Sequence, residues 1–128
     1  MILLLDTATP TCRLSLIDGD QRVDDEWLAD RTLAHGLLRY LSGQLQSQGK
    51  TWSDLTAIGV FQGPGSFTGL RIGMTVLNTI ADSLSIPIVA GMDDAWQDQI
   101  LAKLKAGQND RMVLPVYGRE ARITQSRK

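Results

Sequence analysis

Residues 63–73 read GPGSFTGLRIG, and this stretch decides the fold class because of what lies on either side of it. The apolar run at 57–61 has the length of a buried strand, and residues 70–84 have helical spacing. Glycine tolerates positive φ and close backbone approach, while proline fixes one φ. A Ser or Thr hydroxyl in this stretch is expected to cap the following helix. We therefore predict a Gly-rich turn at a binding edge, made of Gly63, Pro64, Gly65, Ser66 and Thr68.

Two common phosphate-binding loops do not match this turn. A Walker A loop requires a lysine after its last glycine, and no lysine occurs between Lys50 and Lys103. The dinucleotide fingerprint begins correctly at Gly63 and Gly65, but its third glycine, Gly69, comes one residue late. No acidic residue ends the strand predicted at 86–90. Both interpretations are excluded.

Composition indicates one ordinary globular domain. The chain has 128 residues, 43% of them hydrophobic, and a formal net charge of −1, which gives no electrostatic argument for nucleic-acid binding by the whole chain. The segment 111–128 is basic, and either RNA or plain solvation would explain this. A single cysteine, Cys12, excludes an internal disulfide and suits a reducing compartment. With no signal peptide and no run long enough to span a membrane, we expect a cytoplasmic protein without a membrane partner.

The order of predicted elements points to an α/β sheet. We expect strands at 2–7, 14–17, 21–28, 57–61 and 86–90, helices at 32–48, 70–84 and 94–104, and a C-terminal strand pair at 112–117 and 121–125. Asp18-Gly19 is a hairpin signal, so the first strands pair antiparallel. A mixed sheet with the order βββ-α-β-α-β-α, plus that pair, has the organisation of a single ribonuclease-H-like lobe of the actin/Hsp70/sugar-kinase superfamily.

The second predicted helix is apolar nearly all round. One stripe would pack on the sheet and consists of Leu70, Gly73, Met74, Leu77, Ala81 and Leu84. Ile72, Val76, Thr79 and Ile80 occupy much of the remainder. A helix that is apolar on every side is normally buried on every side, whereas a helix covering a sheet in a small domain should meet water on one side.

The first predicted helix carries small residues opposite its leucines. Leu33, Leu37, Leu38, Leu41 and Leu45 form the leucine face, and Gly36, Tyr40, Gly43 and Ser47 lie across from them. Each helical glycine costs about 0.5–1 kcal/mol relative to alanine, which close approach of another backbone would offset. Either the two helices touch each other through Gly43 and Gly73, or they form an intermolecular interface. We favour the interface.

The residues after the first strand suggest at most a vestigial phosphate site. ATPases of the actin-like superfamily carry Asp-x-Gly-Thr/Ser at this place, and the chain has Asp6, Thr7 and Thr9 there, with Ala8 instead of the glycine. Pro10 removes a further amide donor. A weak phosphate contact and a polar strand end that caps its own turn are equally compatible with these residues.

No metal site or catalytic residue is expected. His35 is the only histidine and has no cysteine or carboxylate at ligand spacing. A ribonuclease-H-type nuclease needs several converging carboxylates, and although Glu26 or Asp93 could approach Asp6, nothing in the spacing requires it.

Five stretches resemble the TsaB (YeaZ) family of glycoprotease-like (M22) proteins, over about residues 1–92. They are residues 2–9 (ILLLDTAT), 12–17, His35 with Leu38, 63–73 (GPGSFTGLRIG) and 86–89 (IPIV). The resemblance implies an actin-like fold and a non-catalytic subunit of the complex that forms N6-threonylcarbamoyladenosine at position 37 of ANN-decoding tRNAs. It implies a TsaD-type transferase partner, a TsaE-type ATPase joined through the complex, a homodimer when alone, and indirect contact with tRNA. No cofactor is implied beyond weak ATP or ADP contact within that complex.

By the same resemblance, the first two helices form the partner or dimer interface. Its residues would be Gly36, Tyr40, Gly43, Ser47, Gly69, Arg71, Ile72, Gly73, Val76 and Ile80. The catalytic relative carries paired metal-binding histidines after the strand at 86–90, where this chain has none, so the resemblance implies a pseudoenzyme. The alternative is a divergent ATP-binding hydrolase or a glycoprotease-like enzyme of the same superfamily.

The resemblance also divides the chain. Residues 1–110 correspond to the N-terminal lobe of a TsaB protein, and residues 111–128 to a remnant of the second lobe, either a strand pair or an extended tail. Nucleotide in this superfamily lies between two lobes, so independent ATPase activity is not expected.

Overall fold

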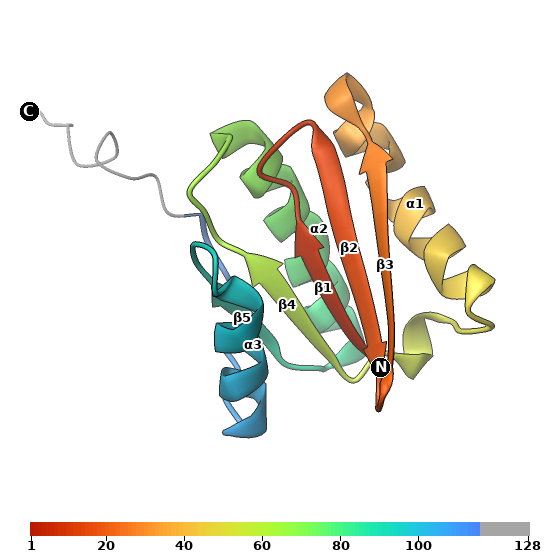
Figure 1. Ribbon diagram of the computed structural model, residues 1–128, viewed down its shortest axis with the longest axis vertical. Helices are drawn as coiled ribbons and strands as arrows, with labels where there is room; N and C mark the ends of the chain where they lie inside the picture. Colours follow the sequence, from red (N-terminus) through yellow and green to blue (C-terminus); the bar gives the residue numbers. More distant parts are fainter. Residues whose placement is uncertain (116–128) are drawn as a thin grey trace, which may run out of the picture.

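The computed structural model describes residues 1–115, which form one five-stranded sheet with the spatial order β3-β2-β1-β4-β5 (Figure 1). The strands are β1 (Ile2–Asp6), β2 (Thr11–Asp18), β3 (Gln21–Leu28), β4 (Ala57–Phe61) and β5 (Ile88–Gly91). The first three form an antiparallel meander, with Asp18 opposite Gln21 at the predicted hairpin, whereas β4 and β5 run parallel to β1. The sheet is therefore mixed, as the chain order predicts.

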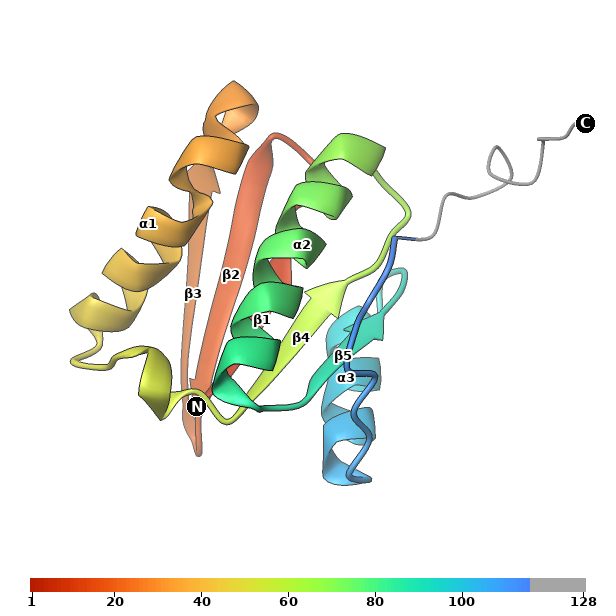
Figure 2. The same cartoon turned by 180° about the vertical axis from the view of Figure 1, so that it is seen from behind.

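Three helices cover the two faces of the sheet unequally. Helices α1 (Leu33–Ser47) and α2 (Phe67–Leu84) lie side by side on one face, and α3 (Trp96–Lys105) lies on the other, beside β4 and β5 (Figures 1 and 2). Two short 3-10 turns, η1 (Asp30–Thr32) and η2 (Trp52–Asp54), precede α1 and β4. The elements follow the predicted chain order; membership of the ribonuclease-H-like superfamily stays a prediction.

The main core lies between the sheet and the pair α1 and α2. Alternate residues of β1 and β2 point into it, because side chains along a strand alternate between faces. Its fully buried large side chains include Leu3, Leu5, Leu37, Leu41, Leu45, Ile58, Leu70, Met74 and Leu77. A smaller cluster of Leu4, Val89 and Ile100 lies under α3.

A side-chain cap explains where α2 begins, whereas α1 and α3 begin without one. Ser66 Oγ accepts a hydrogen bond from the Gly69 amide at 3.3 Å, so α2 begins at Phe67, three residues before the predicted start. Thr51 and Asp54 form a capping box, which opens the short turn η2 before β4. Among residues 1–115, no helix has both the length and the hydropathy required to cross a bilayer.

The predicted C-terminal strand pair is only partly within the described residues. Residues 112–115 form no strand, so that part of the prediction is wrong. Residues 116–117 and 121–125, and most of the proposed second-lobe remnant 111–128, lie outside the described residues. Residues 109–114, here called the strap, instead run back past β5 toward α2 (Figure 2).

Candidate functional site

The Gly-rich turn packs against the turn that follows β1. A Cβ on Gly65 would overlap Ala8, and a Cβ on Gly69 would overlap the carbonyl oxygen of Thr7. The Ser66 amide donates to the Ala8 carbonyl oxygen at 2.9 Å. The glycines are therefore explained by contact within the chain, and the predicted ligand-binding edge is not required to account for them.

Of the three residues predicted as a vestigial phosphate site, only the two threonines line the same hollow. Thr7 is buried, and its hydroxyl donates to the Gly69 carbonyl oxygen at 2.7 Å. The exposed Thr9 donates its hydroxyl to the Thr11 carbonyl oxygen, and both threonines line a hollow of about 260 Å³ at the start of α2. Asp6 lines a different hollow, beside Trp96 at the start of α3. The hydroxyl of Thr7 is thus already engaged and lies apart from the carboxylate.

Asp6 occupies a partly desolvated position. Burial raises the pKa of its carboxyl above 3.8, opposed by a hydrogen bond from the Ala8 amide and by the charge of Arg13. Nearby Asp24 has its pKa lowered, chiefly by a hydrogen bond from Ser15. Among residues 1–115, no three side chains of the His, Cys, Asp or Glu type converge as a metal site.

Two of the four residues predicted to lie opposite the leucines of α1, Gly36 and Tyr40, contact β3 of the chain's own sheet. A Cβ on Gly36 would lie 2.8 Å from the Trp27 ring of β3. Tyr40 stacks on the same ring at a centroid distance of 5.0 Å, and its hydroxyl donates to Asp25 at 2.6 Å. The expectation that Gly36 and Tyr40 lie on an outer face together with Gly43 and Ser47 is therefore wrong, because the Trp27 ring of β3 packs against both of them.

The other two of these four residues, Gly43 and Ser47, lie at the surface. A Cβ on Gly43 would have no atom within 4 Å, and Ser47 is exposed with its hydroxyl donating to the Gln44 carbonyl oxygen. The alternative contact between the helices through Gly43 and Gly73 is wrong, because Gly43 faces open space and Gly73 faces β1.

The glycines of α2 also face inward. Gly73 is buried, and a Cβ there would overlap the Thr7 side chain. The placement of Gly73 at an intermolecular surface is therefore wrong. Both Gly69 and Gly73 let α2 approach the end of β1, but Gly69 is half-exposed, so its assignment to the interface stays a prediction. Arg71 is exposed, with its guanidinium 5.9 Å from the centroid of the Phe67 ring. Ile72, half-buried, lines the hollow at the start of α2.

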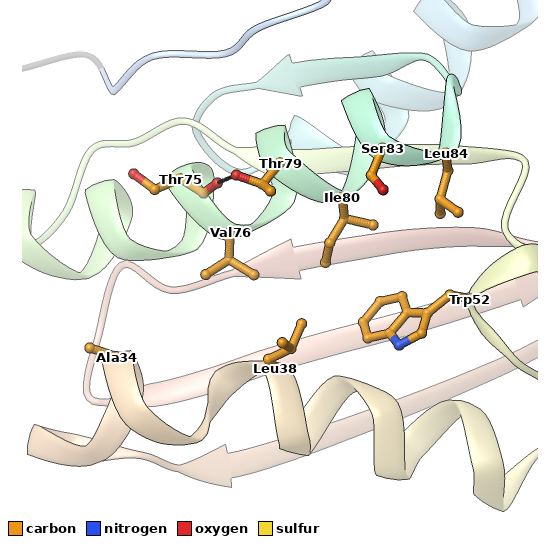
Figure 3. A pocket seen from close by; sticks show the side chains of 9 residues that line it. All are labelled: Ala34, Leu38, Trp52, Thr75, Val76, Thr79, Ile80, Ser83 and Leu84. Atoms are coloured by element: carbon orange, nitrogen blue, oxygen red, sulfur yellow. Dashed lines mark hydrogen bonds between the residues drawn. The ribbon is translucent and has the colours of Figure 1, made fainter.

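An apolar groove separates α1 from α2 on the side away from the sheet. Its volume is about 530 Å³, and its side chains come from α1, η2 and α2 (Figure 3). They are Ala34, Leu38, Trp52, Thr75, Val76, Thr79, Ile80, Ser83 and Leu84. Leu38, assigned from its spacing to the buried leucine face, is 55% exposed and lies at the mouth of this groove. We call this hollow the "α1–α2 groove".

Only two residues of the groove, Val76 and Ile80, are among the interface residues predicted from the sequence. Ala34, Leu38 and Trp52 also line the groove and were not predicted. The sequence does contain a signal for Leu38. The five leucines of α1 cover a wider arc of the helix than the four that are buried against the sheet, Leu33, Leu37, Leu41 and Leu45. Leu38 is the fifth, and it faces away from the sheet.

Comparison with known proteins gives consistent relatives. A family model described as "TsaD: tRNA N6-adenosine threonylcarbamoyltransferase" matches residues 27–91. The chain is 34% identical over 89 residues to the tRNA threonylcarbamoyladenosine biosynthesis protein TsaB of Escherichia coli, covering 69% of this chain and 38% of that protein. It is 36% identical over 91 residues to the protein of the same description in Bacillus subtilis, covering 70% and 39%.

A solved structure from Pseudomonas aeruginosa agrees with these relatives. It is described as an uncharacterized protein with similarity to peptidase YEAZ, has a TM-score of 0.69 and 33% identity, and is matched over 73% of this chain and 44% of that one. The chain spans between 37% and 51% of the length of the curated TsaB proteins that it matches.

Proposed function

The chain belongs to the TsaB (YeaZ) family, and from that premise we propose that it is a non-catalytic scaffold subunit in the formation of N6-threonylcarbamoyladenosine at position 37 of ANN-decoding tRNAs. In this role it docks a TsaD-type transferase through α1 and α2. A TsaE-type ATPase joins through the complex, and tRNA is contacted through the partner.

The α1–α2 groove is the observation that carries the docking proposal. The side chains that line it are largely apolar, and the 55% exposure of Leu38 leaves a large aliphatic side chain in water. Burying such a side chain stabilises a complex by up to about 1.5–3 kcal/mol. Val76 and Ile80 pack on the core from one side and line the groove from the other, so the groove has a firm floor. An apolar helix face of a partner would fill it by helix-in-groove recognition.

The proposal assigns no chemistry to the chain itself. Cys12 is buried, and burial, the largest cause, raises the pKa of its thiol to about 12, so it is no nucleophile at neutral pH. Thr7 and Asp6, the residues nearest to a superfamily phosphate site, point into different hollows. This arrangement supports a scaffold role.

The experiment is co-elution of the chain with the TsaD-type transferase of the same organism. Leu38→Glu places a charge in the groove and is expected to abolish co-elution while the melting temperature changes little. The matched control is Leu28→Glu, because Leu28 is 71% exposed at the end of β3, outside the groove. Unchanged co-elution of Leu38→Glu would contradict the proposal.

An enzyme of the same superfamily is the second candidate, and the description of a solved relative as similar to a peptidase favours it. Purified chain should then cleave a peptide or ATP by itself, with Asp6→Ala abolishing the turnover. The scaffold proposal expects no turnover from either form.

A further inference from the structure

Trp52 is the one aromatic side chain among the nine residues that line the α1–α2 groove. It comes from η2, the turn between α1 and β4, and stands at the other end of the groove from Ala34, beside Ser83 and Leu84 of α2 (Figure 3). The ring is half-buried; it packs against the main core and also lines the groove. A helix that fills the groove would therefore contact this ring.

The backbone of η2 holds Trp52 in place before any partner binds. The Thr51 amide donates to the Asp54 carboxylate at 2.8 Å as part of the capping box, and the Leu55 amide donates to the Trp52 carbonyl oxygen at 3.1 Å. Leu55 is itself buried. A side chain that is positioned in the free protein loses little conformational entropy on binding. Tryptophan is also enriched among the residues that contribute most to binding energy.

The indole N–H of Trp52 donates to no group of residues 1–115. The same is true of Trp27 and Trp96, but neither of these lines the groove. In the free protein, water accepts from the Trp52 N–H. A partner that covers the groove would remove this water, and a buried donor without an acceptor costs its full desolvation penalty. The occupant is therefore expected to carry an acceptor where it meets Trp52.

The groove is matched to a helix of the TsaD-type transferase. The family model described as that transferase matches residues 27–91, a range that includes α1, η2 and α2. The transferase is therefore expected to contain counterparts of these helices and to offer one of them to the groove. Carbonyl oxygens within a helix are already bonded, whereas the last four are free. The acceptor is thus a carbonyl oxygen at a helix end or a side-chain oxygen.

We propose that Trp52 anchors the docked transferase: its ring packs against the transferase helix in the α1–α2 groove, and its indole N–H donates to an oxygen atom of that helix. This inference rests on the proposed function and identifies the residue on which the affinity of the docking site mainly depends.

The first test is NMR of the full chain with its tryptophan indoles labelled with nitrogen-15, which gives one N–H signal for each of the three tryptophans. On addition of the TsaD-type transferase, the Trp52 signal should move downfield and its exchange with water should slow, because a protein acceptor replaces water. The signals of Trp27 and Trp96 are the internal controls and should stay unchanged.

The second test is the dissociation rate constant of the complex. Trp52→Phe keeps an aromatic ring but removes the N–H, and it should raise this constant roughly fivefold. Trp52→Ala should raise it roughly thirtyfold or more. Trp96→Phe is the matched control, because Trp96 is also half-buried but begins α3 on the other face of the sheet; it should leave the constant unchanged. Equal melting temperatures show that the Trp52→Phe and Trp96→Phe variants are folded.

Several results would overturn the inference. An unmoved Trp52 signal in the complex would do so, as would equal dissociation rates for Trp52→Phe and Trp96→Phe. A Trp52 signal that moves with the concentration of the chain alone, and not on addition of the transferase, would assign the ring to a contact between two copies and also overturn it. If Leu38→Glu abolishes binding but the Trp52 signal is unmoved in the wild-type complex, only this inference fails; if Leu38→Glu binds normally, the proposed function fails.

Discussion

Thr7, just after β1, and Gly69, in the first turn of α2, are joined by a hydrogen bond of 2.7 Å from the threonine hydroxyl to the glycine carbonyl oxygen. One turn further along α2, Gly73 leaves room for the same Thr7 side chain. This contact places the start of α2 against the end of β1. The position of α2, which forms one wall of the α1–α2 groove, therefore depends on this contact, and Gly69 and Gly73 serve packing within the chain.

Substituting alanine at two helical glycines should change stability in opposite directions. Gly73→Ala is expected to destabilise the fold by about 1–3 kcal/mol, because its Cβ overlaps the Thr7 side chain. Gly43→Ala should stabilise the fold by about 0.5–1 kcal/mol, because alanine is the better helix former and its Cβ meets open space. Urea unfolding measures both, and a stabilised Gly73→Ala variant would contradict the packing described here.

The strap depends on one side-chain amide of α2. Asn78 donates to the Val113 carbonyl oxygen and accepts from its amide, each at 2.9 Å, and Val113 is buried. Asn78→Leu should cost about 1–3 kcal/mol, because it leaves the backbone groups of Val113 without partners. Peptides covering 109–114 should then exchange hydrogen faster, whereas Asp82→Asn, on the same helix, should leave their exchange unchanged. Equal protection in both variants would disprove the role of Asn78.

Two carboxylates should give opposite pH dependence. The raised pKa of Asp6 means that its contribution to stability is present below pH 3.8 and is lost as pH rises through the folded-state pKa. Asp6→Asn, which can still accept from the Ala8 amide, should therefore have the higher melting temperature at neutral pH, with a gain that shrinks toward pH 3.8.

Asp24 provides the comparison because its pKa is lowered, mainly by the hydrogen bond from Ser15. Its contribution is present above pH 3.8 and is lost as pH falls through the folded-state pKa. Asp24→Asn should thus melt lower than the wild type at neutral pH and converge with it in acid. Melting temperatures of both variants and the wild type, measured from neutral pH into acid, check both predictions. A shift in the same direction for Asp6→Asn and Asp24→Asn at neutral pH would contradict them.

Local patterns predicted the elements well. The strand at 21–28 has the predicted bounds, since the Asp18-Gly19 hairpin and the alternating residues of β3 act locally. Helix α1 is one residue shorter at each end than predicted, and its stripe of Leu33, Leu37, Leu41 and Leu45 is buried as expected. These signals depend on neighbours in the sequence, which a single chain displays.

The candidate site was predicted less well, because it depends on contacts between distant residues. Spacing alone showed that Gly36 and Gly43 lie near one side of α1, but not that Trp27 of β3 reaches only the first of them. The close packing of Gly73 on Thr7 and the hydrogen bond from Asn78 to Val113 likewise join segments far apart in the chain. Periodicity could not distinguish the inward glycines from an outer surface, so the apolar groove was found only in part.

Hydrogen exchange of the full chain, with and without its TsaD-type transferase, shows which face of the chain binds the partner. We expect protection to increase in peptides covering residues 34–38 and 75–84, on the two walls of the groove, and not in peptides covering β2 and β3. Protection confined to β2, β3 or α3, with the groove peptides unchanged, would contradict this expectation.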